Sequence, residues 1–183
     1  MDNILCKRDR AIAIGIDYQE KLMPAMSYSD EKIRQAVKLY AGLTILDVPC
    51  IFSQQYTKGL GETISDIRDS VRDFTFYEKT TFSAMRSNEF ITFLKGSGKT
   101  DIILSGVETH ICVLQTALHL IKEGYSVWLV EDCCASRKEN DKQIALLQMS
   151  GAGVKITTME AILFELMGGS KDPAFKAISD LIK

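Results

Sequence analysis

The segment Ala11-Ile12-Ala13-Ile14-Gly15-Ile16 contains no polar side chain, and Asp17-Tyr18-Gln19 follows it directly. A continuous apolar run of this length is typical of a strand covered on both faces, as in a parallel sheet with helices on each side. The polar residues mark the point at which this strand ends. Because ligands of open α/β sheets bind beyond the carboxyl ends of the strands, this stretch indicates both a fold class and the edge that carries a site.

The rest of the chain alternates short apolar runs with helical patterns. We expect further strands at 49–53, 102–105, 127–130 and 154–156, and a short extended segment at 75–77. Helices are expected at 30–46 with Ser29 as its cap, from Ser87, at 109–123, at 139–150, and after Asp172-Pro173. Strands separated by such helices predict right-handed crossovers. The predicted fold is a single α/β domain over residues 1–183: a doubly wound, mostly parallel sheet in a three-layer α/β/α arrangement of Rossmann-like type.

Composition and charge exclude several classes of protein. The net charge of −2 argues against a nucleic-acid or anionic membrane partner. No apolar run approaches the ~20 residues that span a bilayer. The five cysteines show no framework spacing, which indicates a reducing compartment rather than disulfides. We therefore expect a cytoplasmic protein, with a short mitochondrial address over Met1–Arg10 as the alternative.

Three segments bring chemically active side chains to the carboxyl edge of the predicted sheet. Asp17 ends the first strand, Lys79 follows the 75–77 segment, and Cys112 lies in the first turn of the 109–123 helix. A thiolate is the reactive form of cysteine, and a neighbouring lysine or a helix N-terminus lowers the pKa of a thiol. The carboxylate is suited to take the thiol proton and pass it to a leaving group. These three residues predict a nucleophilic cysteine site.

Other arrangements fit less well. A Cys–His dyad would use His110 or His119, but residues two apart diverge on a helix and residues seven apart are separated by about 10 Å along its axis. The stretch Gly96–Thr100 resembles the end of a phosphate loop, yet Phe93 stands where a glycine is needed and the stretch leads into a strand. A dinucleotide site requires a glycine-rich turn after the first strand, and Asp17–Glu20 is not one.

These motifs resemble those of the isochorismatase-like cysteine hydrolase superfamily, which includes nicotinamidases and related amidohydrolases. Its members carry D-x-Q after the first strand, a lysine followed by an S-A-F-like stretch, and G-x-x-x-x-x-C-V-x-x-T-A at the third core strand. The corresponding stretches are Asp17-Tyr18-Gln19, Lys79 with Phe82-Ser83-Ala84-Met85, and Gly106 through Cys112 to Ala117. The 54–61 segment is similar to the Q-Y-P-K-G-L-G signature of the subgroup around isochorismatase domain-containing protein 2, with Thr57 replacing the proline.

The resemblance implies a mechanism and a set of site residues. It implies a triad of Asp17, Lys79 and Cys112, and a cis peptide at Val107–Glu108 that aims the N–H groups of Glu108 and Cys112 at an oxyanion. The thiolate would attack a carbonyl of a small-molecule amide or related C–N bond, form a thioester, and release it to water. It also implies a homo-oligomer, a dimer or larger. Candidates for the pocket wall, each with loop packing as the alternative role, are Gln19, Gln54, Tyr56 and Phe82.

One departure from the family pattern concerns the metal. Nicotinamidases bind a metal through an Asp-x-His motif after the second strand, whereas this chain reads Ser53-Gln54-Gln55-Tyr56 there and holds only two histidines. A histidine-based metal site is unsupported, so we expect a metal-independent enzyme without a cofactor. Two alternatives remain: an enol-ether hydrolase of isochorismatase type, and a non-catalytic scaffold for binding or assembly.

Overall fold

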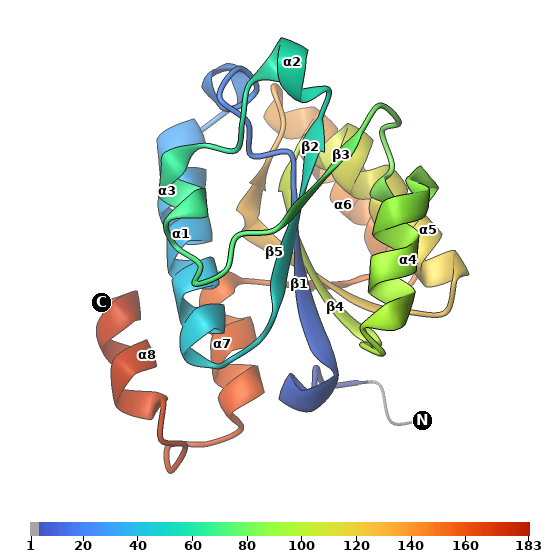
Figure 1. Ribbon diagram of the computed structural model, residues 1–183. Coiled ribbons are helices and arrows are strands. Elements are labelled where there is room, and N and C mark those ends of the chain that lie inside the picture. The colour runs from blue at the N-terminus through green and yellow to red at the C-terminus, as the bar shows by residue number, and fades with distance from the viewer. Residues whose placement is uncertain (1–3) are drawn as a thin grey trace.

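The computed structural model describes residues 4–183 and contains one six-stranded sheet (Figure 1). The strand order is β3-β2-β1-β4-β5-β6, and every neighbouring pair is parallel. The predicted α/β class with a parallel sheet is confirmed. Residues 1–3, which belong to the predicted 1–183 domain and to the alternative targeting segment, lie outside the described range. The strands are β1 (Ala11–Ile16), β2 (Cys50–Gln55), β3 (Phe76–Lys79), β4 (Asp101–Val107), β5 (Ser126–Ala135) and β6 (Lys155–Thr157).

Helices cover both faces of this sheet and form the outer two layers. In Figure 1, α1 and α7 lie on one side of the strands and α4, α5 and α6 on the other, in keeping with two separate apolar clusters. No helix within residues 4–183 is both long enough and apolar enough to cross a membrane. The helices are α1 (Ser29–Ile45), α2 (Thr57–Leu60), α3 (Ser65–Arg68), α4 (Asn88–Gly96), α5 (Leu114–Lys122), α6 (Glu139–Gly151), α7 (Met159–Met167) and α8 (Phe175–Ile182).

Strand β1 lies in the centre, and its alternation of large and small residues reflects its two different neighbours. The isoleucines at 12, 14 and 16 pack into the cluster beneath α4, α5 and α6, while Ala11 and Ala13 face the α1 side. Gly15 also belongs to the small set, because an added Cβ would lie 2.4 Å from the ring of Phe52 and 2.6 Å from the hydroxyl of Tyr40. The small residues of β1 thus make room for large aromatic side chains.

Three details differ from the sequence-based expectations. Ser29 does not cap α1: it is the first helical residue, and the cap position is Tyr28, which has a left-handed backbone and makes no side-chain capping bond. The predicted 109–123 helix is divided into a π-helical turn, Thr109–Val113, and α5. Helix α7 was not predicted. Only two of its nine residues are polar, so it lacks the apolar–polar alternation by which a surface helix is identified.

Candidate active site

Asp17 and Lys79 form a buried ion pair at the carboxyl edge of the sheet. Asp17 follows β1 directly and Lys79 ends β3, two strands away. The Lys79 Nζ atom lies 2.6 Å from Asp17 Oδ2, and the two side chains are 1% and 0% exposed. Asp17 has a φ of 51°, a left-handed conformation that aspartate tolerates better than most non-glycine residues. The turn at this residue places its carboxylate beside the strand ends.

The strand between them, β2, supplies a hydrogen-bond partner for each member of the pair. Ser53 Oγ donates to Asp17 Oδ1 at 2.7 Å, and Lys79 Nζ donates to Gln55 Oε1 at 2.8 Å. The sheet register pairs Ile16 with Ser53 and Gln55 with Lys79, so both partners follow from strand order. Sequence reasoning missed these two positioning residues, because it could not tell that β2 lies between β1 and β3.

Cys112 completes the group that the sequence predicted. Its side chain is buried in the π-helical turn after β4, and its thiol lies close enough to Asp17 and Lys79 for the charges of both to act on it. Burial raises the pKa of this thiol to about 12, the negative charge of Asp17 acts in the same direction, and the Lys79 ammonium opposes them. The net shift is therefore opposite to the expected lowering, although Lys79 itself acts in the predicted direction. The thiol is protonated at neutral pH and lies next to a carboxylate that can accept its proton.

The backbone around the thiol is tightly constrained. Gly106 has a φ of 131°, and a Cβ there would lie 2.2 Å from the carbonyl oxygen of Ile16. Only glycine therefore allows β4 to approach β1 this closely. The peptide bond between Val107 and Glu108 is cis. The N–H of Val113 donates to the Glu108 carbonyl at 3.2 Å and closes the turn that carries the thiol.

Two of the candidates for the pocket wall are engaged in loop packing. Gln19 is fully buried, and its Nε2 donates to the carbonyls of Gln55 and Gly61 at 3.0 and 2.7 Å. Its Oε1 accepts the N–H of Gln55 at 2.7 Å, so the whole amide holds the loop after β2. Gln54 is also buried, and its amide bonds to two threonine hydroxyls at 3.0 Å. Both N–H groups of the Gln19 amide are therefore occupied, whereas Gln54 Nε2 donates one hydrogen bond and keeps a second N–H.

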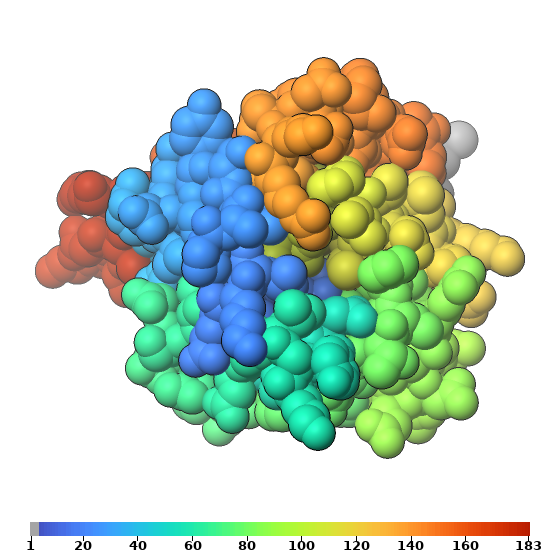
Figure 2. Space-filling model, turned by 90° about the horizontal axis from the view of Figure 1, so that it is seen from above, coloured from blue at the N-terminus to red at the C-terminus, as the bar shows by residue number. Residues whose placement is uncertain are grey.

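The other two candidates lie at the surface of the same edge. Tyr56 and Phe82 are 52% and 55% exposed and come from the segments after β2 and β3. Figure 2 looks down on this edge, and the surface is hollowed where the segments after β1 (blue), β2 (teal), β4 (yellow-green) and β5 (orange) meet. Tyr56 and Phe82 thus lie at the surface of the edge that carries Asp17 and Lys79.

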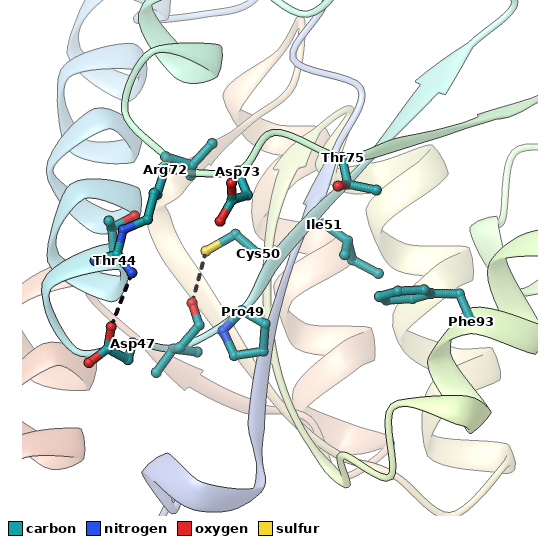
Figure 3. A pocket seen from close by; sticks show the side chains of 11 residues that line it. Thr44, Asp47, Pro49, Cys50, Ile51, Arg72, Asp73, Thr75 and Phe93 are labelled. Atoms are coloured by element: carbon teal, nitrogen blue, oxygen red, sulfur yellow. Dashed lines mark hydrogen bonds and ion pairs between the residues drawn. The ribbon is translucent and has the colours of Figure 1, made fainter.

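A separate cavity of about 310 Å³ lies at the opposite end of the sheet (Figure 3). Its lining includes Pro49, Cys50 and Thr75, which precede or begin β2 and β3, and the ring of Phe93. The Cys50 thiol donates to the Val48 carbonyl, and burial raises its pKa to about 12. Because these residues stand at the amino ends of the strands, the cavity lies at the end of the sheet away from Asp17, Lys79 and Cys112.

The two histidines are bonded to serines. His110 Nδ1 lies 2.9 Å from Ser136 Oγ, and His119 Nδ1 lies 2.8 Å from Ser83 Oγ. Within residues 4–183, no group of three or more His, Cys, Asp or Glu side chains is arranged to hold a metal ion.

Comparison with known proteins gives consistent matches. The family model for the isochorismatase domain matches residues 11–161. Isochorismatase domain-containing protein 1 of Salmo salar is 38% identical, with 91% of this chain and 59% of that protein aligned, so the chain spans about three fifths of that relative's length. Isochorismatase domain-containing protein 2 of Xenopus laevis is 33% identical over 91% of this chain and 80% of that protein. A solved structure described as MAR1 ribonuclease of Caenorhabditis elegans has a TM-score of 0.91 and 35% identity, and covers 96% of this chain and 91% of its own.

Proposed function

This chain belongs to the isochorismatase family, and from that premise we propose that it is a metal-independent cysteine hydrolase for a small-molecule amide or related C–N bond. One observation carries the proposal. The buried thiol of Cys112 lies within the electrostatic influence of a buried carboxylate, Asp17, and the Lys79 ammonium lies 2.6 Å from that carboxylate. This arrangement provides a nucleophile, a base for its proton, and a cation that fixes the base in position.

The proposed reaction uses each of these groups. As Cys112 Sγ bonds to the substrate carbonyl carbon, its proton passes to Asp17, and the carbonyl oxygen gains negative charge next to the N–H groups of Glu108 and Cys112. Asp17 then gives the proton to the nitrogen as the C–N bond breaks, which leaves a thioester. Water adds to the thioester, Asp17 accepts its proton, and the acid leaves as the thiol is restored. Since the thiol is protonated at rest, proton transfer to Asp17 is part of the first step.

A substrate panel tests this proposal with two cysteine variants. Primary amides, carbamoyl compounds and an enol ether are incubated with wild type, Cys112→Ala and Cys50→Ala, the last being the matched control at the far end of the sheet. Single-stranded RNA is included because the related Caenorhabditis elegans structure is described as a ribonuclease. We expect turnover of an amide that is lost only in Cys112→Ala, with an acyl adduct on wild-type Cys112 by mass spectrometry. Equal activity of wild type and Cys112→Ala would refute the proposal.

The same panel separates the alternatives. Turnover of the enol ether that depends on Cys112 would favour isochorismatase-type chemistry over amide hydrolysis. Cleavage of RNA that survives in Cys112→Ala would assign an activity to a different site. No turnover of any member and no adduct would favour the binding or assembly scaffold.

We also propose a cytoplasmic homo-oligomer. All five cysteines are free thiols, as in proteins of a reducing compartment. Helices α5 and α6 expose apolar side chains, with Leu118, Ile144 and Leu147 at 36%, 48% and 70%, and so offer a surface for self-association. Light scattering measures the mass in solution, and a value equal to the 20.4 kDa chain would contradict the oligomer.

A further inference from the structure

The carboxylate of Glu108 is buried and only half satisfied. The side chain stands at the end of β4, immediately before the turn that carries Cys112, and is 7% exposed. Its Oε1 accepts a hydrogen bond from the Arg137 guanidinium at 2.7 Å. Its Oε2 is buried and has no hydrogen-bond partner among residues 4–183. The neighbouring hydroxyl of Thr109 is likewise buried without a partner.

An acceptor of this kind requires an explanation. Buried polar atoms of native proteins are nearly always hydrogen-bonded, and a carboxylate oxygen without a donor loses the free energy of its hydration. Asp17 provides the contrast at the same edge, because Ser53 and Lys79 occupy its two oxygens. Unlike the two oxygens of Asp17, the Oε2 atom of Glu108 is therefore an available acceptor at this edge.

Two observations indicate that Glu108 lies near the Cys112 thiol: their closeness in the sequence and the effect of the Glu108 charge on the pKa of the thiol. Cys112 is four positions further along the chain, and the negative charge of Glu108 contributes to raising the pKa of that thiol. Arg137 follows β5, which pairs with β4 through Val107 and Ala135. Glu108 therefore lies where the carboxyl ends of β4 and β5 meet. The guanidinium is 61% exposed and approaches from the rim, while the carboxylate is its inner partner.

The charges at this edge also limit the class of ligand. Asp17 is paired with Lys79, and Glu108 is paired with Arg137. The two pairs sum to no net charge, so the site has no excess of cations with which to hold an anion. A carboxylate oxygen can only accept a hydrogen bond, so its complement is a neutral group that carries an N–H or O–H.

We propose, on the basis of the hydrolase function above, that Glu108 Oε2 accepts a hydrogen bond from an N–H group attached to the reacting carbonyl of the substrate. Glu108 is then a specificity-determining residue that favours neutral primary amides over esters and carboxylates. An ester offers no donor to this oxygen. A carboxylate offers none either and is repelled by its charge.

Matched alkylating reagents test the proposal without knowledge of the substrate. Iodoacetamide and methyl iodoacetate react by the same step: the Sγ–C bond forms, the C–I bond breaks, iodide leaves, and the thiol proton goes to the buffer base. They differ in carrying –NH₂ or –OCH₃ on the carbonyl. The rate of each on Cys112 is measured at about pH 9 by peptide mass spectrometry, where more thiolate is present. The ratio of the two rates is divided by the same ratio for N-acetylcysteine.

We expect wild type to show a corrected amide-to-ester ratio of roughly 10 to 100, the size of a charge-assisted hydrogen bond. Glu108→Gln should reduce it to within a few-fold of 1, and the exposed control Glu123→Gln should leave it unchanged. A change in the pKa of Cys112 alters both rates equally, so the ratio is insensitive to thiol reactivity.

The result for wild type alone decides the proposal if Glu108→Gln does not fold. A corrected ratio near 1, or no alkylation of Cys112 by either reagent, would overturn it, as would an unchanged ratio in folded Glu108→Gln. The hydrolase proposal fails separately. An elevated ratio without any Cys112-dependent turnover would show that Glu108 recognises the amide in a protein that is not a hydrolase.

Discussion

Removing the ammonium of Lys79 should destabilise the protein far more than removing an exposed lysine. Lys79→Met keeps the length of the side chain but leaves the fully buried carboxylate of Asp17 without its cation. Breaking a buried ion pair in this way costs about 3–5 kcal/mol. With a urea dependence of about 2 kcal/mol per molar, the unfolding midpoint should fall by roughly 1.5–2.5 M. Fluorescence of the only tryptophan, buried Trp128, reports the transition.

The matched control is Lys95→Met. Its partner, Glu123, is 3.8 Å away, the two side chains are 61% and 46% exposed, and the expected loss is below about 1 kcal/mol. Combining Lys79→Met with Asp17→Asn replaces the pair by two neutral groups of similar size. The double variant should be more stable than the sum of the single losses predicts, by at least about 2 kcal/mol. A midpoint for Lys79→Met equal to that of Lys95→Met, or additive losses in the double variant, would refute the buried ion pair.

Three further predictions concern the thiol and the strand next to it. Because burial and the charge of Asp17 raise the pKa of Cys112 to about 12, its alkylation rate should climb about tenfold per pH unit from pH 7 to pH 11; a plateau below pH 9 would contradict this. Asp17→Asn removes a cause of the elevated pKa, so it should accelerate alkylation of Cys112 at neutral pH while abolishing turnover. Gly106→Ala should cost about 3 kcal/mol or more, since its Cβ would meet a backbone oxygen at 2.2 Å. Gly151→Ala, with no atom within 4 Å, should change the free energy of unfolding by less than about 1 kcal/mol in calorimetry.

The sequence predicted the fold class because a buried parallel strand can be identified from its own apolar residues. The apolar run 11–16 contains no polar residue, which is a property of the strand itself and requires no knowledge of its neighbours. Helix α7 shows the limit of this reasoning. It is buried along most of its surface and so has little polar face. The capping residue Thr158, whose side chain accepts a hydrogen bond from the Ala161 N–H, is the local feature of the sequence that indicates where this helix begins.

The sequence by itself determined which residues reach the carboxyl edge of the sheet, because Asp17, Lys79 and Cys112 each end a strand or follow it within a few residues. Only the tertiary structure decided what surrounds them. Strand order placed Ser53 and Gln55 between the ion-pair partners, and the β4–β5 junction brought Arg137 to Glu108. It also reversed the expected shift of the thiol pKa, because that pKa depends on burial and on every charge nearby in space. Neither burial nor the distance between remote charges is encoded at any single position of the chain.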